Sequence, residues 1–155
     1  MPENKKVKNA TPTIVDGIEF KSSLEARTYR HLRDAGFEPV YEGISFNLID
    51  AFYPQGSCFD PHYDYGQKKK VFGLNKTKVQ AITYTPDFSF NIDDKLIVIE
   101  CKGKENDVFP IKKKLFRRWI DAYKRLTGVD ILYFEIHKQS ELEESIAVMQ
   151  SLSPQ

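Results

Sequence analysis

Acidic residues and a lysine lie at the ends of two neighbouring apolar segments of the sequence. Asp87 opens the first segment, and Glu100 and Lys102 close the second. Side chains two positions apart on a strand point to the same face, so Glu100 and Lys102 share a face and Cys101 points to the other. If the two segments pair across the turn at 93–94, Asp87 lies near Glu100.

Carboxylates at the end of a buried strand need a partner for their charge, because burying an unpaired charge is costly. A hard divalent cation binds one or two carboxylates together with water and phosphate oxygens. Such an ion lowers the pKa of bound water and stabilises the charge that builds on a phosphate under attack. Lys102 would then orient the attacking water or hold the scissile phosphate as a point charge. These residues favour phosphodiester hydrolysis with Mg²⁺ as the cofactor and Mn²⁺ as a substitute.

Each of these residues also has a purely structural explanation. Asp87 follows a proline and could be a turn residue. Glu100 and Lys102 could form a cross-strand ion-pair set. Glu25, the fourth candidate for the site, could serve only the capping box that Ser22 opens. None of these explanations predicts that an aspartate and a Glu-x-Lys sequence should end adjacent apolar strands, so the four residues together favour a site.

The elements that must position these residues follow from the periodicity of the apolar residues. Alternation and apolar runs predict strands over 14–20, 37–41, 44–52, 79–84, 87–92, 95–101 and 129–136, the first of them a hairpin around Asp16-Gly17. The 3.6-residue period predicts helices over 22–35 and 110–127, and a short C-terminal helix that Ser140 and Glu143 open as a capping box. This order predicts an α/β or α+β fold, with a mixed central sheet flanked by helices.

Two expectations concern burial within these elements. The run from Leu96 to Ile99 is apolar throughout, which indicates a central strand covered on both faces. In the helix over 110–127, we expect the side chains of an apolar stripe to face the core: Ile111, Leu115, Trp119, Ala122 and Leu126.

The 155 residues suit one domain, which we expect over 13–152 behind a flexible basic tail over 1–12. Residues 53–78 break the pattern, because they combine glycines and prolines with several aromatic residues and the run Lys68–Lys70. Long loops of this kind are often functional or disordered, and the aromatic content is too high for a plain linker. We therefore expect a partly ordered insertion there.

Several classes of protein are excluded or disfavoured. No apolar run approaches the roughly 20 residues of a membrane span, and the polar N-terminus is no secretory signal, which favours a cytoplasmic protein. Cys58 and Cys101 do not make a disulfide framework, and Cys58 with His62 is only half of a zinc pattern. The sequence contains no GxSxG, GK[ST] or GxGxxG motif, so we expect no small-molecule organic cofactor.

The motifs around the acidic residues resemble a known superfamily. Pro86-Asp87, followed after twelve intervening residues by Glu100-Cys101-Lys102, is similar to the signature of the PD-(D/E)XK nucleases. Three segments resemble motifs of the bacteriophage endonuclease I family of Holliday junction resolvases, one a helix-borne glutamate motif and two strand motifs: 20–25, 83–88 and 98–103. The segment 109–116 resembles the lysine-rich helix of small phage-encoded nucleases of the same superfamily. The similarity covers about residues 18 to 120, with the order of motifs preserved.

This resemblance implies a restriction-endonuclease-like αβββαβ core and assigns roles within it. Asp87 and Glu100 would bind the metal with the carbonyl of Cys101, Glu25 would support a second metal or its water, and Lys102 would be the catalytic lysine. It also implies a homodimer that cuts branched DNA in recombination, in the host cytoplasm if phage-encoded. The stretch 47–81 is much longer than in the compact resolvases. Two alternatives therefore stay open: a restriction-like or transposon-end nuclease targeted by a partner, and a DNA-binding module that does not cut.

Phosphate contacts would dominate the recognition of DNA. The net charge is only +1, but basic residues clearly outnumber acidic ones between 102 and 125. A solvated helix face is the alternative explanation for this charge. The candidate contacts lie in the second helix and in the insertion: Lys112, Lys113, Lys114, Arg117, Arg118, Lys68, Lys69 and Lys70. The N-terminal lysines and the arginines at 27, 30 and 33 could add to them.

Overall fold

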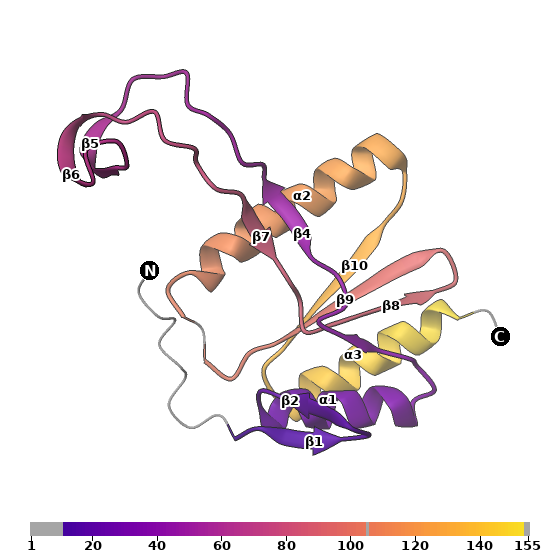
Figure 1. Ribbon diagram of the computed structural model, residues 1–155. Helices are drawn as coiled ribbons and strands as arrows, with labels where there is room; N and C mark the ends of the chain where they lie inside the picture. The colour runs from indigo at the N-terminus through magenta and orange to yellow at the C-terminus, as the bar shows by residue number, and fades with distance from the viewer. Residues whose placement is uncertain (1–10, 105, 154–155) are drawn as a thin grey trace. The chain divides into compact units, whose positions relative to one another are not determined.

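The computed structural model describes residues 11–104 and 106–153 and divides into two compact units (Figure 1). Unit 1 comprises Met1–Phe46 and Thr85–Gln155, and unit 2 comprises Asn47–Tyr84. Most of the predicted basic tail lies outside the described residues. The insertion expected over 53–78 falls within unit 2, and the single domain over 13–152 stays a prediction.

A four-stranded mixed sheet forms the centre of unit 1, in the strand order β10-β9-β8-β3. The strands are β3 (Val40–Tyr41), β8 (Phe88–Ile92), β9 (Lys95–Cys101) and β10 (Ile131–Ile136). β8 pairs antiparallel with both β3 and β9, whereas β10 runs parallel to β9. The tight turn between β8 and β9 contains Asp93, whose positive φ of 51° is one that Asp tolerates well. The expected central strand is therefore β9, which has a neighbour on each side.

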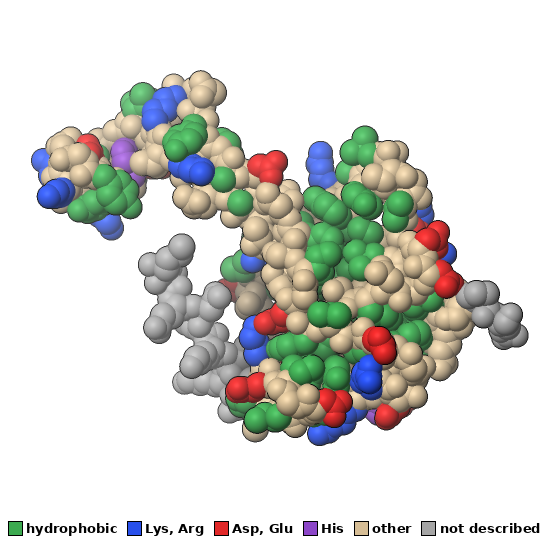
Figure 2. All heavy atoms as spheres, turned by 45° about the vertical axis from the view of Figure 1, so that its right-hand side comes forward, with side chains coloured by type: hydrophobic (Ala, Val, Ile, Leu, Met, Phe, Trp, Pro, Cys, Tyr) green, Lys and Arg blue, Asp and Glu red, His purple; other side chains and the backbone are tan. Residues whose placement is uncertain are grey.

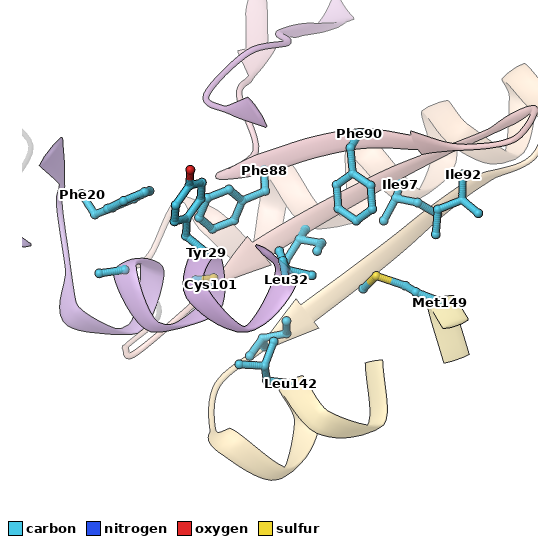
Figure 3. Close-up of a cluster of buried hydrophobic side chains, with 13 residues drawn as sticks. Phe20, Tyr29, Leu32, Phe88, Phe90, Ile92, Ile97, Cys101, Leu142 and Met149 are labelled. Carbon is cyan, nitrogen blue, oxygen red and sulfur yellow. The ribbon is translucent and has the colours of Figure 1, made fainter. Parts of the chain in front are cut away.

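Helices cover both faces of this sheet (Figure 1). They are α1 (Ser23–Asp34), α2 (Phe109–Thr127) and α3 (Gln139–Leu152). Alternate residues of β8 and β9 pack with α1 and α3 in the main core, where Tyr29, Leu32, Leu142 and Met149 approach the sheet (Figure 3). On the other face, Phe116 of α2 meets Tyr133 of β10, with ring centroids 5.4 Å apart. The expected mixed sheet flanked by helices is confirmed.

Shorter elements complete unit 1. β1 (Thr13–Val15) and β2 (Ile18–Phe20) form the predicted hairpin, whose turn residues Asp16 and Gly17 both have positive φ. Two consecutive residues with positive φ are typical of the turn that best matches the twist of a hairpin. Gly128 ends α2 in the left-handed conformation, with φ of 75°.

Two strand pairs form unit 2, the first of them beginning one residue before the unit, at Phe46. β4 (Phe46–Ile49) pairs with β7 (Ile82–Tyr84), and β5 (Phe59–Asp64) pairs with β6 (Lys69–Leu74). The strands predicted over 44–52 and 79–84 are thus shorter than expected, with an isolated bridge between Phe52 and Val79 beyond them. The prediction of a strand over 37–41 was also too long, because only its last two residues pair.

Two expectations about helices were wrong. In α2 the apolar stripe has a different register: Phe116 is fully buried, whereas Leu126 is 86% and Ile111 60% exposed. The reason is that Phe116 packs between Tyr133 and Phe46, and this contact fixes the rotation of the helix. α3 begins before the expected Ser140–Glu143 capping box, because Glu141 accepts hydrogen bonds from the backbone N–H groups of residues 137 and 138.

Among residues 11–104 and 106–153, none forms a helix that is both long and apolar enough to cross a membrane.

Candidate active site

The β8–β9 hairpin brings Asp87 to Glu100, as the sequence predicted. Phe88 pairs with Ile99, and extending this register by one residue places Asp87 opposite Glu100. Oδ2 of Asp87 accepts a hydrogen bond of 2.7 Å from the backbone N–H of Cys101. The carbonyl of Asp87 accepts a second bond of 2.8 Å from the N–H of Glu42, just beyond β3. Asp87 is therefore fixed from both neighbouring strands.

Glu100 and Lys102 share a face of β9 and form an ion pair. Nζ of Lys102 lies 2.6 Å from Oε1 of Glu100, and the Glu100 side chain is only 5% exposed. The ammonium group also lies 4.4 Å from the centre of the Phe109 ring at the start of α2, a distance at which a cation is attracted to the ring. Cys101 points to the opposite face, where its Sγ contacts Oγ1 of Thr28 at 3.4 Å in the main core.

The surroundings of Asp87 disfavour its ionised form. Burial and the neighbouring negative charge of Glu100 raise the pKa of Asp87 to about 8, and Glu25 adds to the increase. The N–H of Cys101 and the charge of Lys102 act in the opposite direction but do not cancel it. Two carboxylates are therefore held close together in a partly dehydrated place, which a bound cation would stabilise.

Glu25 lies near this pair but is engaged by its own surroundings. It is 7% exposed in the first turn of α1, where Ser22 is the N-cap. Its Oε1 accepts a hydrogen bond of 2.9 Å from Ser22, and its Oε2 accepts one of 2.6 Å from the hydroxyl of Tyr41 and one of 3.1 Å from the N–H of Lys21. Only half of the expected capping box is formed: Oγ of Ser22 accepts a hydrogen bond of 3.2 Å from the N–H of Glu25, whereas the Glu25 carboxylate bonds to the N–H of Lys21 instead of returning to that of Ser22. Glu25 also influences Asp87 through its charge.

Lys21 is a residue of the site that the sequence reasoning did not assign. Its ammonium forms an ion pair with Glu42, and the charges of Glu42, Glu25 and Asp87 all act to raise its pKa. Its presence within the segment resembling the glutamate motif was a signal that could have identified it. Tyr41 was also missed, because β3 is too short to show a periodic pattern.

A second unpredicted cluster lies beside Glu100. Glu135 of β10 is the parallel partner of Glu100, so the two side chains share a face of the sheet. Glu135 lies 2.5 Å from Nζ of Lys113 and 2.7 Å from Nε2 of His137. Burial acts to raise the pKa of Glu135, but these two partners outweigh it and lower the pKa. The signal that could have identified Glu135 was its position as the one acidic residue within the segment 131–136.

The donor set suits a hard divalent cation held by few protein ligands. In the described part of the chain, no group of three or more His, Cys, Asp or Glu side chains lies close enough to hold a metal ion. An ion would therefore rest on Asp87 and Glu100 with water, a set that fits Mg²⁺, which keeps several of its waters. Glu25, with both oxygens already bonded, would act through such water. The role of the Cys101 carbonyl as a further metal ligand stays a prediction.

The predicted phosphate contacts differ in availability. Lys113 is engaged with Glu135 and Lys112 is partly buried, whereas Lys114, Arg117 and Arg118 are exposed on α2. These three exposed residues form no ion pair with any residue that the structure describes. In unit 2, Lys68, Lys69 and Lys70 are exposed at the tip and start of β6.

The sequence was compared with known proteins. The model of the family described as protein of unknown function (DUF1064) matches residues 5–137. A search of curated proteins and a search of solved structures found no match.

Proposed function

We propose that this chain, which belongs to the family described as protein of unknown function (DUF1064), is a metal-dependent endonuclease that hydrolyses DNA phosphodiester bonds. The observation that carries the proposal is the meeting of Asp87, Glu100 and Lys102 at the end of the β8–β9 hairpin. Paired carboxylates beside a lysine suit a cation, a water and a phosphate. The sequence contains no motif of another catalytic class in which these three residues would take part.

The order of the elements in unit 1 supports the proposal. Leaving the β1–β2 hairpin and the C-terminal α3 aside, the chain of unit 1 runs α1, β3, β8, β9, α2 and β10. This is the αβββαβ order that the resemblance to PD-(D/E)XK nucleases implies. Glu100 also lies on β9, Asp87 directly precedes β8, and Glu25 lies on α1, which are the positions that the resemblance assigns to them.

The residues of the site have separable tasks in this proposal. Bound Mg²⁺ would activate water and neutralise charge on the phosphate. Asp87 and Glu100, both ionised, would bind the Mg²⁺ ion. The N–H of Cys101 fixes the orientation of the Asp87 carboxylate through its hydrogen bond. Lys102, fixed by Glu100 and Phe109, would donate a hydrogen bond to the attacking water or to a non-bridging phosphate oxygen. Water adds to phosphorus, the bond to one ester oxygen breaks, and that oxygen takes up a proton.

We further propose branched DNA as the substrate and a cytoplasmic homodimer as the working form. Exposed Lys114, Arg117 and Arg118 support contact with phosphates near the site. The size of unit 2 favours one alternative, a restriction-like or transposon-end nuclease that a partner targets. A DNA-binding module that does not cut is the remaining alternative, and the charge repulsion at Asp87 argues against it.

Cleavage assays test the proposal directly. The wild-type chain is incubated with a four-way junction, a flap, linear duplex and single-stranded DNA, with Mg²⁺ or with EDTA. We expect metal-dependent cutting of the branched substrates, and its loss in Asp87→Asn and Glu100→Gln. Cutting by these variants at the wild-type rate would refute the site, whereas preference for linear duplex would retain the nuclease and reject the junction. A monomer in light scattering with and without junction DNA would reject the dimer.

A further inference from the structure

The hairpin formed by β5 and β6 has one aromatic face that no described residue buries. The register pairs Phe59 with Leu74, Pro61 with Phe72 and Tyr63 with Lys70, so these side chains lie on one face. Phe72 is 75% exposed and Phe59 63%. Tyr65, at the start of the turn, is 79% exposed, and its ring centre lies 5.0 Å from that of Tyr63. Figure 2 shows hydrophobic and lysine side chains side by side over this hairpin.

The acidic residues of the hairpin lie on its other face and already have partners. Asp60 contacts His62 at 3.2 Å and Asn75 at 3.0 Å. Asp64 accepts hydrogen bonds from the N–H groups of Gly66 and Gln67, and these bonds lower the pKa of its carboxyl. The negative charges of the hairpin are therefore turned away from the aromatic face and occupied.

Lysines at and next to the aromatic face have no ion-pair partners in the described chain. Lys70 belongs to the face itself and Lys68 lies in the turn, whereas Lys69, opposite Asp64, lies on the other face. None of the three forms an ion pair with residues 11–104 or 106–153. Unit 2 contains five lysines against three aspartates and no glutamate.

From this arrangement we infer that the aromatic face of the β5–β6 hairpin binds an unpaired DNA strand, its rings stacking on bases and its lysines contacting phosphates. Exposed aromatic rings interleaved with cations are the recurring way to bind single strands without reading their sequence. The inference rests on the proposed function only in taking DNA as the partner. It adds that the preferred substrate contains unpaired nucleotides, such as a flap or an opened junction.

A second copy of the chain is the competing occupant of the face. The lysines argue against it, because two copies meeting through this face would bring Lys70 and its neighbours together without acidic partners. A polyanion neutralises the same charges and releases counterions. The charge complementarity therefore favours a nucleic acid strand.

Binding can be measured on the full chain without cleavage. In EDTA, fluorescence anisotropy follows a labelled oligothymidylate of about 20 nucleotides, a duplex of equal length and an abasic strand with the same phosphates. We expect the oligothymidylate to bind more tightly than the other two. We also expect Tyr65→Ser and Phe72→Ser each to weaken its binding by about 5- to 100-fold. Ile14→Ser, which removes a 70% exposed side chain in unit 1, is the matched control and should bind as wild type.

Three results would overturn the inference. They are equal binding of the abasic strand and the oligothymidylate, wild-type affinity in both hairpin variants, and a dimer that Phe72→Ser dissociates without changing DNA affinity. Cleavage with Mg²⁺ is scored separately. If the hairpin binds the strand but the chain cuts no DNA, the proposed nuclease is refuted and this inference stands. If both hairpin variants cut flaps at the wild-type rate and bind the strand with unchanged affinity, this inference is refuted and the proposed nuclease stands.

Discussion

The backbone N–H of Cys101 donates a hydrogen bond of 2.7 Å to Oδ2 of Asp87, so the strand that contributes Glu100 also orients the aspartate opposite it. This bond favours the ionised form of Asp87, which burial and the negative charge of Glu100 both disfavour. The β8–β9 hairpin therefore determines both the orientation of the Asp87 carboxylate and the shift of its pKa.

The first prediction concerns stability against pH without metal. The pKa of Asp87 is about 8 in the folded chain and about 4 when the chain is unfolded. Between these values the native state binds the additional proton at Asp87, so the contribution of Asp87 to stability is fully present below about pH 4 and is lost as the pH rises to about 8. Urea unfolding across this range in EDTA should show a decline that Asp87→Asn reduces. Asp34→Asn, at an exposed position, is the control, and an unchanged decline in Asp87→Asn would contradict the assignment.

The second prediction concerns metal binding. Mg²⁺ added near pH 8 should raise the melting temperature of the wild type, because an ion that binds only the folded chain stabilises it. The shift should disappear in Asp87→Asn and in Glu100→Gln, and it should persist in Glu143→Gln on the exposed side of α3. Differential scanning fluorimetry measures it. Equal shifts in all four proteins would show that the ion binds elsewhere.

The third prediction separates Lys102 from the metal ligands. Lys102→Met should lower the rate of junction cleavage by about 10²- to 10³-fold, because it removes a fixed charge beside the phosphate. The Mg²⁺-induced thermal shift should remain. Lys95→Met, on the same strand but paired with Asp94, provides the control for cleavage. Single-turnover rates at saturating enzyme are the measurement, and a near-wild-type rate in Lys102→Met would remove Lys102 from the mechanism.

The fourth prediction concerns the support of Glu25. Tyr41→Phe deletes the hydroxyl that donates to Oε2 of Glu25 at 2.6 Å. The free energy of unfolding should fall by about 1 to 3 kcal/mol, because the carboxylate loses a charged hydrogen bond. Tyr65→Phe, at a 79% exposed position, should change it by less than about 0.5 kcal/mol. Urea denaturation near neutral pH compares the two, and equal stabilities would show that the Tyr41 hydroxyl contributes nothing.

The fifth prediction tests the register of α2. Phe116→Ala should lower the free energy of unfolding by about 3 to 5 kcal/mol, because the ring is fully buried. Leu126→Ala should have an effect below about 0.5 kcal/mol, since that side chain is 86% exposed. Similar losses in both variants would favour the stripe expected from the sequence.

The sequence alone determined the elements and the contacts that are local along the chain. The turn at 93–94 and the alternation on either side of it fix the β8–β9 register, which brings Asp87 to Glu100 and sets Lys102 on the same face. Ser22 and Glu25 likewise lie within one helical turn, so their capping interaction was predictable. Such contacts depend on backbone geometry over a few residues.

Tertiary structure decided the contacts that join distant segments. Glu135 lies beside Glu100 because β10 returns parallel to β9 after α2, and the sequence contains no local signal for that pairing. Tyr41 reaches Glu25, and Phe116 rather than Leu126 faces the core, because side chains packed from several elements fix the rotation of each helix and the position of each short strand. Periodicity shows which face of an element is apolar, but the best fit among several apolar side chains is chosen by packing between elements.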